Sequence, residues 1–291
     1  MSVMTAGGRS RWIGYLPRYL VMVPITLAFI FPFYWMLVIA TGTLQTVFQF
    51  PPILYPLGHW ENFLVAWGAA IDPSNNQYLH IDWPRFYFNT VLIATLTTLA
   101  VLVTSVLAGY AFASMSFPGK GLVFGLVLAI YMVPTEVTLV PNFIILKDLS
   151  WIDTYQAQIV PFAASVFGIF LMRQFFLTLP RDLWEAAQLD GCGHLRFLTT
   201  IALPLAQAPL ITIALFHFVA SWNAFLWPLI MTTSESVRPV QVALQYFSYA
   251  DATNPVTHSA GSLMVTVPIL IIFVFAQRYL VGGIASTGIR G

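Results

Sequence analysis

The chain of 291 residues alternates between long apolar stretches and short polar connections. Six of the stretches are long enough to cross a membrane as a helix, which takes about 20 residues. Because lipid offers no partners to backbone N–H and C=O groups, each stretch must be helical. Transmembrane strands are excluded, since these stretches lack alternation of apolar and polar residues. The predicted spans are residues 16–40, 86–113, 122–140, 156–177, 205–231 and 259–280.

The first of these spans follows Arg9, Arg11 and Arg18, an arrangement that secretory signal peptides also show. The apolar core of a signal peptide has about 7 to 15 residues, and the run 19–40 is longer. We therefore expect a retained first helix. The predicted fold class is an all-α integral membrane protein with six transmembrane helices and one domain over residues 1–291.

Lysine and arginine residues are distributed unevenly among the connections between the predicted spans. With both termini in the cytoplasm, nine of the 12 lie inside and three lie outside. The positive-inside rule selects this orientation. The inside set is Arg9, Arg11, Arg18, Lys120, Arg173, Arg181, Arg196, Arg278 and Arg290, and the outside set is Arg85, Lys147 and Arg238.

The composition is typical of a membrane protein and limits the kinds of partner that the chain can bind. Apolar residues make up 58% and charged residues only 8% of the chain, whereas a soluble domain carries about 25% charged residues. The net charge of +1 provides no basic surface for nucleic acid, and the lone Cys192 cannot form an internal disulfide or a thiolate-rich metal site. We therefore expect lipid as a partner and no nucleic acid.

Two predicted spans carry seams of small residues along one helix face, which lets helices approach closely in lipid. Helix packing and the lining of a polar pathway are both compatible with such seams. The seam residues are Thr90, Ala94, Thr97, Val101, Thr104, Ala108 and Ala111 in the second span, and Ser259, Ser262 and Thr266 in the sixth.

The predicted cytoplasmic connection between the fourth and fifth spans, residues 179–204, contains structural signals of its own. Pro180 and Asp182 suit a first helical turn, where a proline loses no hydrogen bond and the helix dipole favours an anion. Gly191 can end that helix, and a second short helix through residues 197–201 would lead into the next span. We expect a helix-turn-helix element just below the bilayer.

Seven positions in this connection follow a fixed spacing, with three residues between Ala187 and Gly191 and nine between Gly191 and Ile201. The pattern resembles the Glu-Ala-Ala loop of the permease subunits of ABC importers. The resemblance implies a coupling helix that is held in a cleft of a cytoplasmic ATPase subunit. The coupling residues that it implies are Glu185, Ala186, Ala187, Asp190, Gly191, Ile201, Leu203 and Pro204.

Other stretches resemble the carbohydrate-type branch of these permeases, which is maltose-transporter-like and glycerol-phosphate-transporter-like: residues 152–155, 168–176, 221–229 and 282–291. The resemblance implies import of a sugar, polyol or glycerol-phosphate-type solute across a bacterial-type inner membrane. It also implies three kinds of partner: a second homologous permease, two cytoplasmic ATPase subunits and an extracytoplasmic solute-binding protein.

The chain lacks the motifs that would make it an enzyme in its own right. Its only Gly-Lys pair, Gly119 and Lys120, has neither the glycine spacing nor the following Ser or Thr of a phosphate-binding loop. The motifs of metalloproteases and serine hydrolases are also missing from the sequence. We therefore assign ATP and Mg²⁺ to the partner ATPase, no cofactor to this chain, and no catalytic residue.

Three residues are candidates for the translocation pathway. Glu136 lies between two prolines at membrane depth, where a carboxylate suggests a functional site, although a headgroup position is also open. Trp222 and Asn223 combine an aromatic ring with an amide, which suits a sugar, although an interfacial aromatic belt would look the same. The predicted spans hold no Lys or Arg near the bilayer centre, which favours a neutral solute.

Two other classes of function stay open on the sequence. An ion-coupled secondary transporter would use Glu136 as its coupling site and would need no ATPase. A membrane enzyme or assembly scaffold would have neither an ATPase nor a binding protein as partner.

Overall fold

The computed structural model describes residues 9–72, 77–78, 80–249 and 254–287, so that Arg290 lies outside the described residues. The chain falls into two compact units, each with contacts of its own. The first is Met1–Ile81 with Tyr246–Thr266, and the second is Asp82–Gln245 with Val267–Gly291. The predicted single domain over residues 1–291 stays a prediction.

The first unit is built from a long apolar helix and a compact connection. It contains α1 (Arg9–Ala40), α2 (Leu44–Val47), α3 (Glu61–Ala66), α15 (Tyr246–Tyr249) and the beginning of α16 (Pro255–Thr287). The strands β1 (Ile71–Asp72) and β2 (Gln77–Tyr78) form an antiparallel ladder of two residues each. The fold is therefore helical, as predicted, with this short ladder as a minor addition.

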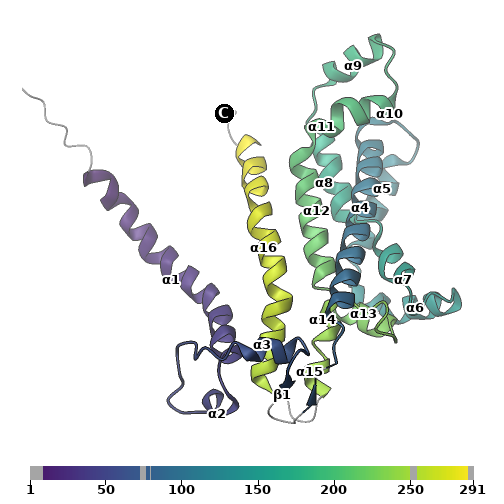
Figure 1. The fold of residues 1–291 in the computed structure, drawn as a ribbon. Coiled ribbons are helices and arrows are strands. Elements are labelled where there is room, and N and C mark those ends of the chain that lie inside the picture. The colour runs from purple at the N-terminus through teal and green to yellow at the C-terminus, as the bar shows by residue number, and fades with distance from the viewer. Residues whose placement is uncertain (1–8, 73–76, 79, 250–253, 288–291) are drawn as a thin grey trace, which may run out of the picture. The chain divides into compact units, whose positions relative to one another are not determined.

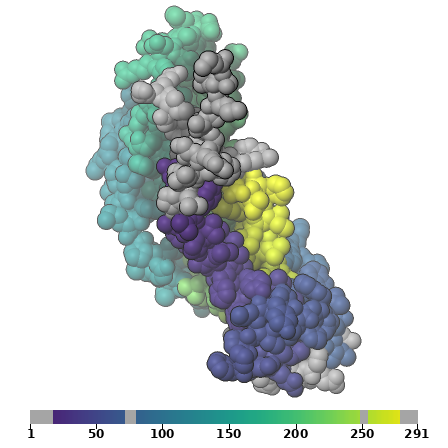
Figure 2. Space-filling model, turned by 90° about the vertical axis from the view of Figure 1, so that its left-hand side faces the viewer, coloured from purple at the N-terminus to yellow at the C-terminus, as the bar shows by residue number. Residues whose placement is uncertain are grey.

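Apolar side chains of α1 lie on the surface, as expected for a helix that faces lipid. Phe29 is 75% exposed and Leu20 is 68% exposed. Figure 2 draws the surface of α1 in purple.

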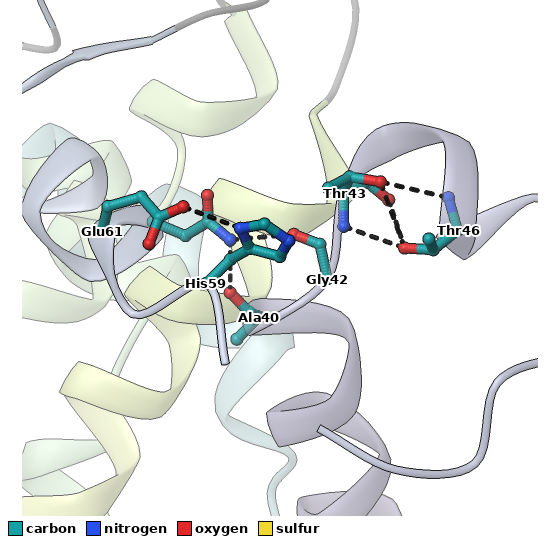
Figure 3. Close-up of polar contacts among 7 residues, drawn as sticks. Ala40, Gly42, Thr43, Thr46, His59 and Glu61 are labelled. Carbon is teal, nitrogen blue, oxygen red and sulfur yellow. Dashed lines mark hydrogen bonds and ion pairs between the residues drawn. The ribbon is translucent and has the colours of Figure 1, made fainter. Parts of the chain in front are cut away.

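Polar contacts hold the connection that follows α1. Thr43 and Thr46 form a capping box at the start of α2, and Asn62 donates from Nδ2 to the carbonyls of Ala40 and Gly42, each at 2.9 Å. Figure 3 shows these contacts together with His59 Nδ1, 2.7 Å from Glu61 Oε1. These hydrogen bonds give the connection a defined structure of its own.

The second unit is a helix bundle built around α4 (Trp83–Ser114). Figure 1 shows α4, α8 (Val166–Leu177) and α12 (Gln207–Trp222) side by side. The remaining elements are α5 (Lys120–Ile130), α6 (Thr135–Asp148), α7 (Tyr155–Ile159), the 3₁₀-helix η1 (Val160–Phe162), α9 (Arg181–Leu189), α10 (His194–Phe197), the π-helix η2 (Leu198–Ala202), α11 (Leu203–Leu205), α13 (Leu226–Met231), α14 (Val240–Ala243) and the later part of α16.

The small-residue seam of α4 lies inside this bundle, where α4 crosses α8 at close range. A Cβ atom added at Gly109 would lie only 2.6 Å from Cβ of Met172 and 3.0 Å from the backbone nitrogen of Arg173. Thr104 Oγ1 donates to the carbonyl of Ala163 at 2.8 Å. Close backbone approach thus joins α4 to α8, and the hydrogen bond joins α4 to the end of η1, as small residues allow in lipid.

Four described helical segments are long and apolar enough to cross a membrane, and up to six if each of two bent pairs counts as one span. The predicted span over 122–140 is divided, because α5 and α6 meet at 96°. Pro134 explains the break: it disfavours the helical conformation at the residue before it. The fifth predicted span is also divided, since α12 ends at Trp222 and α13 begins at Leu226.

Candidate functional site

The connection 179–204 forms the predicted helix-turn-helix element. Pro180 stands at the N-cap of α9, and Asp182 lies in its first turn. The second helix begins at His194, earlier than expected, and continues through the π-helix η2. Figure 1 shows α9 and α10 at one end of the bundle, beside the end of α4.

A Schellman motif ends α9 at Gly191. The backbone N–H of Cys192 donates to Ala187 O at 2.9 Å, and the N–H of Gly191 donates to Gln188 O at 3.0 Å. Gly191 has a φ of 73°, in the left-handed region that costs other residues about 1–2 kcal/mol. The expectation that Gly191 makes the sharp turn is therefore supported by its backbone geometry.

The two faces of α9 differ in exposure. Ala187 is buried against the bundle, with 6% of its surface exposed, and packs in the same cluster as Phe197 and Leu198. Glu185 and Ala186 are exposed, and Leu189 is 90% exposed. Ala187 thus packs within its own chain, and Ala186 lies on the open face of α9.

An aromatic cluster connects this element to α4. The ring of His194 stacks on Trp184, with centroids 4.3 Å apart and planes 16° apart. His194 Nδ1 lies 3.0 Å from the hydroxyl of Tyr110 in α4. Phe197 packs edge-on against Trp184 at 5.0 Å, and Phe176 of α8 packs edge-on against Tyr110 at 5.6 Å. These five residues, which we name the coupling cluster, link both helices of the loop to α4 and α8.

The second helix of the loop leads directly into the bundle. The continuous segment His194–Leu205 contains Ile201, Leu203 and Pro204 and meets α12 at an angle of 80°. The π-helix η2 lies within this segment, and such wide turns occur frequently at functional sites. The loop is therefore joined to α12 by a short helical segment.

A second candidate site lies toward the other end of α4. A pocket of about 160 Å³, which we name the α4–α12 pocket, opens between α4, α7, η1, α12 and α13. Its walls include Thr90, Thr97, Gln158, Phe162, Ser221 and Trp227. Two of its wall residues, Thr90 and Thr97, belong to the small-residue seam predicted on α4, so part of that seam lines a cavity.

Hydrogen bonds hold the loops at this end of α4. Asn89 is fully buried and donates from Nδ2 to Ser236 O at 3.0 Å and to Arg238 O at 2.9 Å. Its Oδ1 accepts from the Tyr155 hydroxyl at 2.6 Å, and Thr90 Oγ1 accepts from the Val240 N–H at 2.7 Å. We name the hydrogen bonds made by Asn89 and Thr90 the polar network.

Asp153 adds a charged group to the same loops. Its Oδ1 accepts from the backbone N–H groups of Thr233 and Ser234, at 3.0 and 2.9 Å. Burial acts to raise the pKa of the Asp153 carboxyl, but these hydrogen bonds outweigh it and hold the pKa below its usual value. Asp153 therefore stays ionised and fixes the loop after α13.

The three predicted pathway residues do not come together in one site. Glu136 is exposed in the first turn of α6, whereas Trp222 is buried at the end of α12 with its ring 6.4 Å from that of Tyr87. Asn223 is exposed, and its side chain donates to Val219 O and accepts from Gln241. None of the three lines the α4–α12 pocket.

Sequence reasoning missed Tyr110 and Gln158. The sequence marks neither residue, because Tyr110 reads as one more aromatic in an apolar span and Gln158 as a polar residue near a span end. Each residue becomes part of a site only through its contacts with helices that are distant in sequence. In the part of the chain that the structure describes, no group of three or more His, Cys, Asp or Glu residues could hold a metal ion.

The fold defines a class of membrane protein. A solved bacterial ABC transporter involved in the import of the acidic polysaccharide alginate has the same fold, with a TM-score of 0.78 over 95% of this chain and 99% of that chain, at 20% identity. The fold is therefore that of an ABC importer permease.

The chain belongs to the family of binding-protein-dependent transport system inner membrane components, whose model matches residues 102–285. It is similar to the arabinooligosaccharides transport system permease protein AraQ of Bacillus subtilis, with 34% identity over 75% of this chain and 76% of AraQ. It is also similar to the sn-glycerol-3-phosphate transport system permease protein UgpE of Yersinia enterocolitica, with 31% identity over 90% of this chain and 92% of UgpE. The chain is thus a transport subunit of the inner membrane and not an enzyme, and membership implies in general a partner permease, an ATPase and a binding protein.

Proposed function

We propose that this chain forms half of the translocation pathway of an importer for a sugar, a polyol or a glycerol-phosphate-type solute. The names of AraQ and UgpE support this range of solutes. In the proposed assembly, this chain pairs with a second homologous permease, two cytoplasmic ATPase subunits hold ATP and Mg²⁺, and an extracytoplasmic binding protein delivers the solute. In the proposed topology of six spans, both termini and the loop 179–204 lie in the cytoplasm, which the distribution of Lys and Arg supports.

The proposal rests on the structure of residues 179–204, which we name the coupling loop. An exposed carboxylate at Glu185 and an exposed Leu189 flank Ala186 on a short helix that is fixed to the bundle by its other face. This surface suits docking in a partner's cleft, because a charge, a small residue and an apolar side chain lie on one face. Asp190, Gly191, Ile201, Leu203 and Pro204 hold the docking helix in position as parts of the turn and of the segment into α12.

The proposed mechanism converts nucleotide binding into movement of helices. ATP binding closes the ATPase dimer and draws the two coupling loops together. The coupling cluster passes that movement to α4 and α8, and the bundle changes from inward-open to outward-open; hydrolysis resets it. Glu136, Trp222 and Asn223 stay candidates for the pathway in this scheme.

Two substitutions in the loop test the proposal in proteoliposomes that contain the complete importer. Gly191→Asp and Glu185→Lys are expected to abolish ATP-driven uptake while the chain stays in the membrane. The matched control is Gly193→Asp, because Gly193 has an ordinary φ of −82°, a Cβ there meets no atom within 4 Å, and Asp is favoured at an N-cap. Unchanged uptake in both loop variants would contradict the proposed coupling.

Reconstitution of the chain alone separates this proposal from a secondary transporter. The proposal expects no uptake from the purified chain under a proton or sodium gradient. Gradient-driven uptake without ATP would instead favour the alternative in which Glu136 couples solute to an ion.

A further inference from the structure

Two buried polar groups on the wall of the α4–α12 pocket lack partners among the described residues. Gln158 is 3% exposed and Thr97 is 4% exposed, yet Gln158 Nε2 and Thr97 Oγ1 make no hydrogen bond to the described protein. Leaving a buried donor unsatisfied costs about 1–3 kcal/mol, so such groups are rare in native proteins. Both groups are therefore available to a bound molecule inside the pocket.

Thr97 differs in this respect from Thr90 and Thr104 of α4. Thr90 Oγ1 donates to Phe86 O at 2.8 Å, and Thr104 Oγ1 donates to Ala100 O at 3.0 Å, so each hydroxyl is satisfied within its own helix. Thr97 makes no such bond. Its hydroxyl keeps both its donor and its acceptor capacity on the wall of the pocket.

The volume of the pocket indicates the size of its occupant. At about 160 Å³ the pocket exceeds by far the roughly 10–15 Å³ that one water needs. It is smaller than the roughly 300–1,000 Å³ of sites that enclose a drug-sized ligand. A single sugar ring or a short polyol matches this range.

The chemistry of the walls indicates an uncharged and polyhydroxylated occupant. Phe162 and Trp227 form an edge-on aromatic pair at 5.0 Å on one side, and Ser221 adds a third hydroxyl or amide group to those of Thr97 and Gln158. None of the residues that line the pocket is an Asp, Glu, Lys or Arg. His217 also lines the pocket, where its Nε2 lies 2.8 Å from Ser165 Oγ, so the walls hold no permanently charged group, whereas hydroxyl groups find donors and acceptors beside apolar rings.

We propose that the α4–α12 pocket binds one uncharged ring or polyol segment of the transported solute, and that Gln158 and Thr97 hydrogen-bond its hydroxyl groups. This inference rests on the proposed function and narrows it, since it selects an uncharged solute and assigns it to a site that excludes Asn223. The pocket then acts as a subsite of the pathway within this subunit.

Cysteine protection in the complete importer tests the pocket without relying on transport. In a Cys192→Ala background, Ser221→Cys places one thiol on the pocket wall, and its rate of labelling by a methanethiosulfonate reagent is measured. The probes are L-arabinose, glycerol and glycerol 3-phosphate at equal millimolar concentrations. We expect L-arabinose or glycerol to slow labelling and glycerol 3-phosphate to have no effect. Equal labelling rates with all probes would mean that the pocket holds water only, and equal protection by glycerol 3-phosphate would exclude an uncharged specificity; either result overturns the proposal.

Substitutions at the two unpartnered groups give a second measurement. Thr97→Val and Gln158→Leu should each raise the half-protective concentration about fivefold, the loss expected for one hydrogen bond of about 1 kcal/mol. The matched control is Thr98→Val: Thr98 Oγ1 is also buried and unpartnered in the described structure but does not line the pocket. An equal effect of Thr98→Val would assign the change to helix packing and overturn the proposal. Gly191→Asp, assayed for uptake in the same liposomes, reports on the proposed function separately.

Discussion

The two ends of α4 differ in the residues that pack around them. At the coupling loop, Tyr110 lies among aromatic rings that fill the space around it. At the other end, Asn89 and Thr90 are held by hydrogen bonds to loop backbone, and a pocket opens beside them. A filled aromatic contact transmits displacement, whereas a hollow with unpartnered polar groups accepts a ligand. The contrast shows that the packing at the two ends of one helix suits two different tasks, as we propose.

The largest effect is expected from breaking the polar network. Asn89→Ala removes a fully buried amide and its three hydrogen bonds, to Ser236 O, Arg238 O and the Tyr155 hydroxyl. We expect a loss of about 3 kcal/mol in stability, since each hydrogen bond contributes about 1 kcal/mol. Thermal unfolding in detergent measures it. The exposed Asn223→Ala is the control, and equal melting temperatures for the two variants would contradict a structural role of the network.

The second-largest effect is expected at the crossing of α4 and α8, which lies between the two ends of α4. Gly109→Ala places a methyl group 2.6 Å from Met172 Cβ, so the helices must move apart, at an overpacking cost of about 1–3 kcal/mol. The variant should melt earlier and accumulate less in the membrane. Gly125→Ala in α5 adds the same methyl group where no atom lies within 4 Å, and it should leave both quantities unchanged. Identical behaviour of the two variants would rule out a tight crossing.

A smaller effect is expected at the coupling cluster. Tyr110→Phe removes only the hydroxyl that meets His194 Nδ1, worth about 0.5–1.5 kcal/mol. Because this bond joins the loop to α4, fewer solute molecules should be imported per ATP hydrolysed, while the ATPase rate stays near that of the unmodified importer. The exposed Tyr131→Phe serves as control. An unchanged ratio of solute to ATP would remove Tyr110 from the coupling pathway.

The smallest effect is a pH dependence at Asp153. Its folded-state pKa is lowered, so its ionised form contributes stability above the unfolded pKa of about 3.8, and this contribution is lost as the pH falls through the folded pKa. Melting curves between pH 5 and pH 3 should show a steeper decline for the unmodified chain than for Asp153→Asn. Parallel declines would mean that the hydrogen bonds to Thr233 and Ser234 do not stabilise the folded state.

Local rules predicted the helical fold and the coupling loop. Long uncharged runs require helices in lipid, Asp182 and Pro180 start α9, and Gly191 ends it, because each of these effects acts within one or two turns. The bend at Pro134 is equally local, yet apolar composition on both sides of it concealed the break. The six-span count and the orientation of the termini stay predictions.

The two sites were harder to predict, because their parts come from distant segments. Tyr110 meets His194 across 84 residues, and the pocket joins residues from Thr90 to Pro239. Which polar side chain lacks a partner depends on the packing of all its neighbours, so the role of Gln158 has no signature along the chain.

α4 crosses α8 closely at two residues, since a Cβ added at Gly168 would meet Ser105 and one added at Gly109 would meet Met172, and this crossing sets a mechanical ratio. At a rise of 1.5 Å per residue, Tyr110 lies about 7 Å from Ser105 along the axis of α4, and Thr90 lies about 22 Å away in the other direction. If α4 tilts as a stiff lever about this fulcrum, a displacement of about 1 Å at Tyr110 becomes about 3 Å of opposite sign at Thr90. Under the proposed mechanism, a small displacement of α4 at the coupling loop is therefore enlarged beside the α4–α12 pocket, where the solute is expected to lie.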